Sequence, residues 1–221
     1  MLPLSFLAQD LPQCCEIDAF PIELCSDRET QSLKELLPEG KAIIVLAHHV
    51  KHSLEWVWFP LESERNNVTC PADLHLKSEC EKLAAILEKR GHHNVIIPYP
   101  GRCGIRFKDL ADKTGLGKMG DNFLFLHKEW GPWTHLRVII TDVEIAGTMP
   151  PCDEVCNHCG KCIAACPAQL IKEDTLLGVE CDEYQDMKDA ETGLQGSYVY
   201  KCEACARACP IGTAPERIRI G

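Results

Sequence analysis

The sequence lacks three features: an excess of basic residues, a long apolar run and a charged leader. Its 221 residues include 23 Lys and Arg against 33 Asp and Glu, which gives a formal net charge of −10. A surface that binds nucleic-acid phosphates broadly needs a basic footprint, so we expect no broad nucleic-acid binding. No stretch approaches the roughly 20 apolar residues of a membrane-spanning helix, so we expect no membrane embedding.

The N-terminus also lacks the pattern of a secretory signal. Its short apolar run has no basic residues before it, is broken by Pro3 and ends at Asp10. We therefore expect a cytoplasmic location, where thiols stay reduced and cysteines hold metal rather than form disulfides.

Cysteine is the residue present in excess. The chain has 15 cysteines, and nine of them lie between Cys152 and Cys209. This uneven distribution divides the chain near Thr148. We expect a mixed α/β domain over residues 1–148 and a metal-nucleated, ferredoxin-like module over residues 149–221.

The first cysteine run has the spacing of a bacterial ferredoxin. It reads C-x2-C-x2-C-x3-C-P from Cys156 to Pro167. In this motif the first three thiolates bind one 4Fe-4S cluster and the fourth binds a second cluster. The motif therefore predicts that a partner run lies elsewhere in the chain.

The partner run reads C-x2-C-x3-C-P from Cys202 to Pro210 and is short of one upstream ligand. Cys181 is the only cysteine between the two runs, so it is the expected eighth ligand. Crossing of the fourth ligands ties the two ends of the module together. We assign one cluster to Cys156, Cys159, Cys162 and Cys209, and the other to Cys181, Cys202, Cys205 and Cys166.

Zinc is the alternative metal, because paired C-x2-C units also make four-cysteine zinc sites. A zinc ribbon gives no reason for the third cysteine or for the C-P step in both runs, so the spacing favours two clusters. Cys152 precedes Cys156 by an x3 gap and is the poorer ligand. Cys80 is expected to be a buried apolar residue, and Cys14-Cys15 incidental.

The first 148 residues show the periodicities of strands and helices. A β-branched apolar run predicts a buried strand over Lys41–Ala47. An amphipathic pattern closed by a glycine predicts a helix over Ala72–Arg90. The other expected elements are strands at Asn94–Pro98, Asn122–His127 and Leu136–Ile145, a helix at Phe107–Thr114 and a turn at Trp130–Trp133.

Histidines follow the first expected strand at positions 48, 49 and 52. Imidazoles at such a strand end could bind a metal. Neighbouring side chains of an extended segment point to opposite faces, so His48 and His49 cannot both face one site. We therefore expect these histidines to form a polar loop end and not a metal site.

Three segments, taken in order, resemble the epoxyqueuosine reductase and reductive dehalogenase superfamily. They are Lys108–Asn122 (KDLADKTGLGKMGDN), Trp130–Asp142 (WGPWTHLRVIITD) and the double cysteine motif. The resemblance implies a nitroreductase-like α/β domain that binds cobalamin or another corrinoid, with the nearer cluster passing electrons to the cobalt. The family's corrinoid loops fall on Gly115, Gly117, Lys118, Met119, Gly120, Asn122, Trp133, Thr134, His135 and Arg137.

The chain also departs from that family. Epoxyqueuosine reductases carry an aspartate proton donor that has no counterpart here, because Pro98–Arg106 contains no carboxylate. Those enzymes also continue past the second cluster into a helical-repeat domain, which would follow where this sequence ends. We therefore expect a substrate other than epoxyqueuosine in tRNA. Reductive dehalogenases use a tyrosine as acid, and Tyr99 is the nearest candidate, although a packed rim residue is the plainer interpretation.

Two functions remain open at this point. The first is a corrinoid- and iron–sulfur-dependent reductase of a small organic molecule, in which the protein supplies positioning, potential and water exclusion. The second is an electron-transfer or activation protein that reduces a corrinoid on a partner and has no substrate of its own. Both require a low-potential electron donor protein. A flavin-dependent relative is a third possibility without a supporting motif.

Overall fold

The fold is built on a four-stranded sheet in the order β2–β3–β9–β6, and every neighbouring pair in it is antiparallel. A computed structural model of the chain describes residues 1–61, 68–99, 104–147, 149–172, 175–193 and 197–216. The four strands are β2 (Cys15–Pro21), β3 (Ala42–His49), β9 (Thr134–Thr141) and β6 (Asn94–Ile96).

Strand β3 is buried on both faces because helices cover both sides of the sheet. Ile43 and Val45 pack into one apolar cluster, and Ile44 and Leu46 pack into another. Successive side chains of a strand point to opposite faces, so one continuous apolar run supplies both halves of the core.

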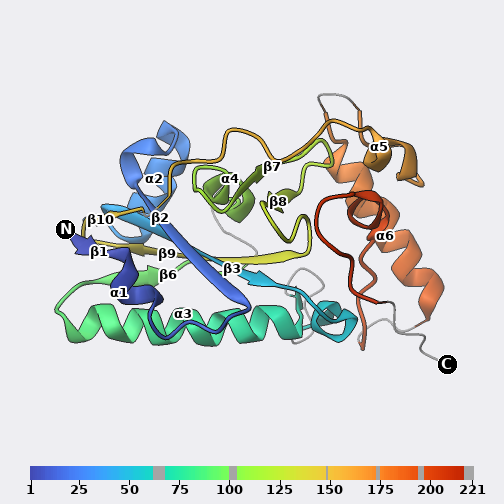
Figure 1. Cartoon of the computed structure of the whole chain (residues 1–221). Helices are drawn as coiled ribbons and strands as arrows, with labels where there is room; N and C mark the ends of the chain where they lie inside the picture. The colour runs from blue at the N-terminus through green and yellow to red at the C-terminus, as the bar shows by residue number, and fades with distance from the viewer. Residues whose placement is uncertain (62–67, 100–103, 148, 173–174, 194–196, 217–221) are drawn as a thin grey trace.

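Helix α3 (Pro71–Lys89) covers one face and helices α2 (Asp27–Leu36) and α4 (Phe107–Ala111) cover the other (Figure 1). The buried residues of α3 recur at helical spacing, from Leu76 through Cys80 and Leu83 to Leu87. Helix α2 begins with a capping box between Ser26 and Glu29. Helix α1 (Leu4–Ala8) lies on the α3 side.

Short strand pairs complete the N-terminal part. They are β1 (Leu2–Pro3) with β10 (Ile145–Ala146), β4 (Phe59–Pro60) with β5 (Val68–Thr69), and β7 (Gly117–Met119) with β8 (Phe125–His127). Two 3-10 turns lie at Ile22–Leu24 and Ser53–Trp56.

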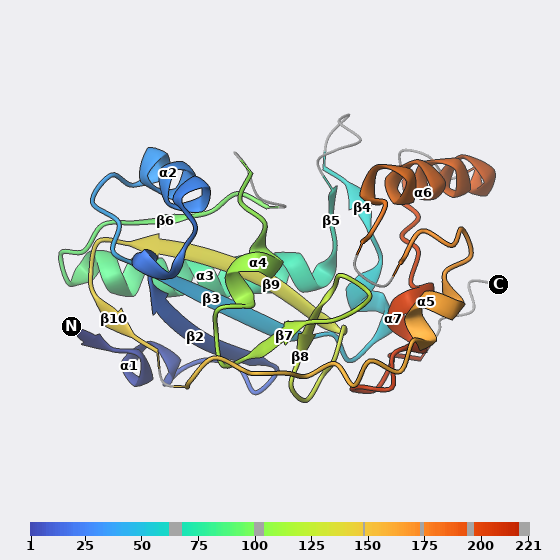
Figure 2. The same ribbon diagram turned by 90° about the horizontal axis from the view of Figure 1, so that it is seen from above.

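The cysteine-rich part consists of two short helices and one longer helix. Helices α5 (Lys161–Ala165) and α7 (Ala204–Ala208) lie side by side, and α6 (Gly178–Thr192) lies at the same end of the molecule (Figure 2). Ala206 of α7 packs with Trp58 and Trp133 in an apolar cluster, and the Val199 N–H donates to the Trp58 carbonyl over 2.9 Å. These contacts hold the cysteine-rich part against one end of the sheet.

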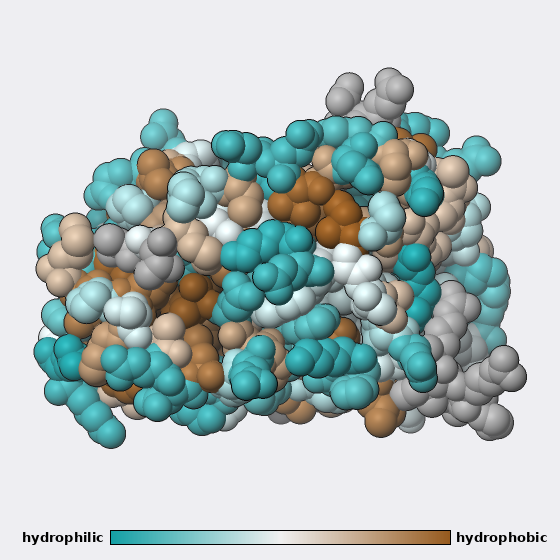
Figure 3. All heavy atoms as spheres, in the orientation of Figure 1, coloured by the Kyte–Doolittle hydropathy of each residue, from teal (hydrophilic) through white to brown (hydrophobic). Residues whose placement is uncertain are grey.

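The face of the molecule seen in Figure 3 is mainly hydrophilic, with separate apolar patches. Among the described residues, no helix combines the length and the apolar character that crossing a membrane requires.

The mixed α and β composition expected from the sequence is confirmed, as are most of the expected elements. The expected strand at Leu136–Ile145 is divided into β9 and β10, and β8 begins only at Phe125. Strand β2 was not predicted from the sequence, because Asp18 interrupts its run of apolar residues. That aspartate is 1% exposed and accepts a hydrogen bond from the Gly115 N–H over 2.9 Å. The expected domain boundary at Thr148 lies outside the described residues, as does Cys103, and stays a prediction.

A substitution at Gly131 can test how tightly the sheet part of the chain packs against the cysteine-rich part. A Cβ atom there would lie 2.0 Å from the Ile211 carbonyl oxygen, whereas Gly193, with a similar positive φ, has open space. We expect Gly131→Ala to lower the free energy of unfolding by about 2 to 4 kcal/mol, against about 1 to 2 kcal/mol for Gly193→Ala. Denaturant unfolding of anaerobically prepared protein measures both, and equal losses would contradict the packing role.

Candidate functional site

Four cysteines line one cavity at the end of the sheet. Cys156 and Cys159 come from the loop before α5, Cys162 is the second residue of α5, and Cys209 directly follows α7. The cavity is completed by Gly160, Pro210 and several residues described below. The return of Cys209 to the first cysteine run is the crossed arrangement that the motif predicts.

The second group of cysteines gathers around Cys181, which lies in the first turn of α6. Burial, followed by Asp182 and the sulfurs of Cys202 and Cys166, raises the pKa of the Cys181 thiol. Burial, with Cys202 as the next contribution, raises the pKa of Cys205 to about 12. Gln185 hydrogen-bonds to the backbone of both Cys181 and Cys202, which places these two cysteines beside each other.

Hydrogen bonds surround this second group. Burial alone would raise the pKa of Cys166, but backbone N–H groups starting with that of Leu170 lower it overall, and the Leu170 N–H lies 3.3 Å from Sγ. Gln185 accepts from the Cys202 N–H over 3.1 Å and donates to the Cys181 carbonyl over 3.4 Å. N–H groups near cluster sulfurs are a means of setting reduction potential.

The donor chemistry of both groups fits iron–sulfur clusters. Each offers four sulfurs, and sets of four thiolates suit zinc or iron–sulfur centres. The short helices α5 and α7 carry the same spacing and each ends at a cysteine followed by proline, which favours clusters. Which sulfur binds which iron stays a prediction.

Cys152 lies outside both groups. Its Sγ donates to the Gly115 carbonyl over 3.3 Å, and its N–H bonds the Thr114 carbonyl. The residue therefore anchors the segment that leads into the first cysteine run.

The glycines assigned to a corrinoid loop lie against the chain itself. A Cβ on Gly115 would lie 2.3 Å from Met149 Cβ, and one on Gly117 would lie 2.1 Å from the Leu126 carbonyl oxygen. A Cβ on Gly120 would lie 2.5 Å from Leu126 Cδ1. These glycines permit close packing within the protein.

The polar residues of the same segment also have partners within the chain. Lys118 Nζ pairs with an Asp112 oxygen at 2.9 Å, and the Met119 N–H donates to Asp112 over 2.7 Å. Asn122 is 3% exposed, and its side-chain oxygen accepts from the Leu124 N–H over 3.1 Å.

The second assigned segment is buried in a charged network. Trp133 is 1% exposed, and the Arg207 guanidinium lies 5.0 Å from its ring centroid. Arg137 donates two hydrogen bonds of 2.8 Å to the Asp73 carboxylate, and His135 Nε2 lies 2.8 Å from the same carboxylate. The Thr134 hydroxyl donates to the Gly131 carbonyl.

Burial alone would raise the pKa of Asp73, but hydrogen bonds from His135 and Arg137 hold it well below its usual range. Burial lowers the pKa of His135, and its Nε2–H donates to the Asp73 carboxylate, which can only accept. Asp73 had no signal in the sequence because its partners lie more than 60 positions away along the chain.

Tyr99 is partly buried in an aromatic group. Its ring centroid lies 5.0 Å from that of His135 and 6.1 Å from that of Trp58, and Arg137 stands 5.5 Å above it. Burial raises its pKa, which makes the phenol a weaker acid. Its catalytic role stays a prediction, and its packing role is visible.

Corrinoid binding by the ten assigned residues stays a prediction, and three of the glycines and Arg137 pack against the chain itself. The glycine segment instead borders the first cysteine cavity, which Asp121, Asn122 and Leu126 help to line. His158, within the first cysteine run, bonds Asp121 with 2.8 Å between Nδ1 and Oδ1. This hydrogen bond was not predicted from the sequence, although the position of a histidine inside the cysteine motif could have suggested it.

Comparison with known proteins supports the iron–sulfur interpretation. Residues 155–212 match the family described as a 4Fe-4S double cluster binding domain. An epoxyqueuosine reductase of Synechocystis sp. is 26% identical over 191 residues, covering 81% of this chain and 65% of that protein. One from Cyclobacterium marinum is 32% identical over 110 residues, covering 47% of this chain and 36% of that protein. The chain thus spans less than two thirds of the length of these relatives.

Solved structures share the fold. Epoxyqueuosine reductase from Bacillus subtilis superposes with a TM-score of 0.69 at 16% identity, over 97% of this chain and 65% of that one. The reductive dehalogenase NpRdhA superposes with a TM-score of 0.55 at 16% identity, over 79% of this chain and 26% of that one. The resemblance inferred from the sequence motifs is confirmed: the chain is similar to epoxyqueuosine reductases in sequence and in fold.

The Asp73 network yields a direct test of its structural role. Asp73→Asn leaves Arg137 buried without its counter-charge, so we expect a loss of about 3 to 5 kcal/mol in the free energy of unfolding. Because the pKa of Asp73 is depressed in the fold, its contribution is complete at neutral pH and is lost only as the pH falls below the usual carboxyl range.

Denaturant unfolding at pH 7 measures this loss. Adding Arg137→Met to Asp73→Asn should recover part of it, because the uncompensated charge is then gone. The control Glu191→Gln breaks an exposed pair with Lys188 and should change stability by less than about 1 kcal/mol. A loss for Asp73→Asn no larger than that of the control would contradict the network's role.

Proposed function

We propose that this chain is an iron–sulfur redox protein that holds two 4Fe-4S clusters and relays single electrons to an acceptor. The observation that carries the proposal is that Cys209 lines one cavity with Cys156, Cys159 and Cys162, while Gln185 bonds the backbone of both Cys181 and Cys202. The match of residues 155–212 to the double cluster binding domain supports it.

The two groups are neighbours. Cys162 of the first group lies in α5 and Cys205 of the second lies in α7, and these two helices lie side by side. Bound clusters would supply one-electron chemistry at these two positions. The protein's own residues bring the two sets of sulfurs together, hold Cys162 away from water at 8% exposure and direct backbone N–H groups at Cys166.

The finer proposal concerns the acceptor. We propose a nitroreductase-like N-terminal domain and a corrinoid acceptor, since one related structure is described by its mechanism for B12-dependent dehalogenation. The packing of Gly115, Gly117 and Arg137 against the chain itself favours the second of the two candidate functions. In that function the corrinoid is carried by a partner, and this chain activates it by reduction.

This function has consequences for partners and location. A low-potential electron donor protein must reload the clusters, and the acceptor must reach the end of the sheet where Asp121 and Asn122 line the first cavity. Thiolate ligands must stay reduced before the clusters assemble, so we propose a reducing compartment such as the cytoplasm.

Cluster content and ligand assignment are tested together. Anaerobically reconstituted protein should hold about eight irons and eight sulfides per chain. Cys181→Ala should lose the cluster of the second group and about half of the iron, whereas Cys152→Ala should keep both clusters because its sulfur bonds only the Gly115 carbonyl. Iron and sulfide analysis with electron paramagnetic resonance of the reduced protein measures this. Stoichiometric zinc in place of iron would reject the clusters, and loss of a cluster in Cys152→Ala alone would reject the assignment.

The corrinoid is tested by separating binding from reduction. Protein reduced and then freed of reductant should convert hydroxocobalamin from Co(III) to Co(II), with one electron leaving each reduced cluster for each cobalt. Because Gly115, Gly117 and Arg137 pack against the chain itself, the protein should not retain cobalamin on gel filtration. Stopped-flow absorbance follows the reduction, and methyl viologen serves as a control acceptor.

Each outcome of this experiment decides between functions. Reduction of methyl viologen without reduction of cobalamin would reject the corrinoid acceptor while keeping the electron-transfer function. Retention of one cobalamin per chain would favour the first candidate, a reductase that carries its own corrinoid.

A further inference from the structure

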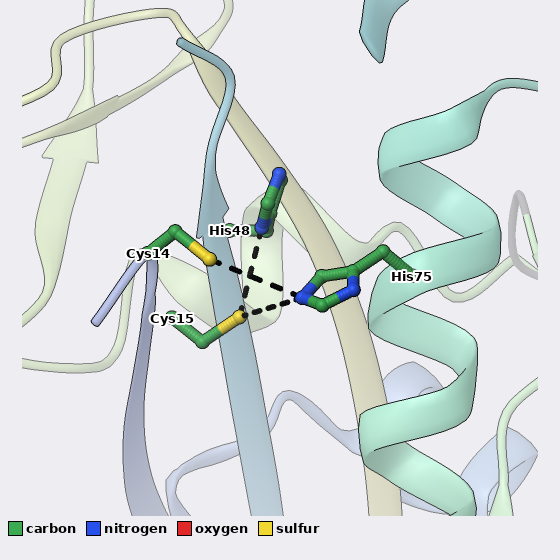
Figure 4. A group of neighbouring side chains, drawn as sticks. All are labelled: Cys14, Cys15, His48 and His75. Carbon is green, nitrogen blue, oxygen red and sulfur yellow. Dashed lines mark hydrogen bonds between the residues drawn. The ribbon is translucent and has the colours of Figure 1, made fainter. Parts of the chain in front are cut away.

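Four side chains with metal-binding atoms converge on one point outside the two groups of cluster cysteines. They are Cys14, Cys15, His48 and His75, and their ligand atoms all lie within 4.8 Å of one another (Figure 4). They come from the start of β2, the end of β3 and the second turn of α3.

The architecture of the sheet brings them together. Cys15 and His48 are directly opposite in the β2–β3 register, so their side chains share a face. That face carries Leu46 and is covered by α3, from which His75 reaches across (Figure 4). His48 is only 2% exposed, so it is not the polar loop end expected from the sequence. His49 points away and stacks on Trp130.

The distances match those of ligands around one tetrahedral ion. The sulfur–nitrogen separations are 3.6 Å for Cys15 to His48, 3.8 Å for Cys15 to His75 and 3.9 Å for Cys14 to His75. With Zn–S near 2.3 Å and Zn–N near 2.0 to 2.1 Å, tetrahedral geometry places sulfur and nitrogen about 3.6 Å apart.

Ordinary thiol–imidazole hydrogen bonds explain the group less well. His75 Nε2 is almost equally distant from both sulfurs. A neutral ring nitrogen carries either one proton or one lone pair, so it can satisfy only one of the two thiols. A shared cation between the four atoms accounts for both distances.

The surroundings supply what a metal site needs. His48 has Nδ1 toward Cys15, and its Nε2 lies 3.1 Å from a Glu55 oxygen. A carboxylate on the far nitrogen of a ligating histidine orients the ring and is common around zinc. Cys14 and His75 are partly exposed, which leaves a route for the ion.

We propose that Cys14, Cys15, His48 and His75 bind one Zn²⁺, as a structural centre separate from the iron–sulfur clusters. Two thiolates and two imidazoles are a common zinc donor set, and four protein ligands leave no open position for catalysis. The ion would fasten the first residues of β2 to β3 and to α3. This inference does not depend on the proposed redox function.

The test uses the full chain with both clusters assembled. After anaerobic purification and removal of loose metal, elemental analysis should find about one zinc per chain beside the iron. X-ray absorption at the zinc edge should show two sulfurs at about 2.3 Å from the zinc and two nitrogens at about 2.0 to 2.1 Å. A shell of four sulfurs would place the zinc in the cluster sites and overturn the proposal.

Variants separate this site from the clusters. Cys15→Ser and His75→Gln should each lower zinc content at least about tenfold and leave iron and sulfide unchanged. The matched controls Cys25→Ser and His92→Gln lie outside the site and should retain zinc. His75 is partly exposed, so His75→Gln decides the matter if Cys15→Ser does not fold.

Two results would overturn the proposal. One is a folded His75→Gln protein that binds zinc as the original chain does. The other is a cluster-loaded original chain that, once freed of bound zinc by a chelator, takes up no stoichiometric zinc from a Zn²⁺ titration against a chromogenic chelator.

Discussion

The convergence of eight thiols is the constraint around which the C-terminal part of this chain is arranged. Cys166 directly follows helix α5 and Cys209 directly follows helix α7. Cys209 lines one cavity with the first three cysteines of the other run. The crossing forces α5 and α7 to lie side by side, so a ligand requirement acts as a tertiary contact. Burial, followed by the neighbouring sulfur of Cys202, raises the pKa of the Cys205 thiol, and a bound metal centre would offset the cost of ionising it.

The cysteine-rich part depends on the sheet domain for its position. The Trp130–Gly131 turn meets the backbone at Ile211 and Gly212 with no room for a side chain. Asp121 reaches His158 inside the first cysteine run, and Arg207 stacks on Trp133. The segments by which this chain resembles epoxyqueuosine reductases thus join its two parts.

The same motif can therefore serve two purposes. A run of glycines permits a close approach, and the approaching group can be a ligand or the protein's own backbone. In this chain, Met149 and Leu126 are the groups that approach. This is why the motif is good evidence of ancestry and weaker evidence of a bound corrinoid.

The sequence by itself determined the cluster motif, the prediction that Cys181 is its missing ligand, the buried strand β3 and the amphipathic helix α3. Each is a local pattern in which spacing or periodicity reflects geometry within a few residues. Contacts between distant positions were decided only by the tertiary structure. Asp73 finds Arg137 across 64 positions, and Cys15 meets His75 across 60. Nothing in the local pattern marks such partners, because the strand register and the helix placement that join them come from packing of the whole core.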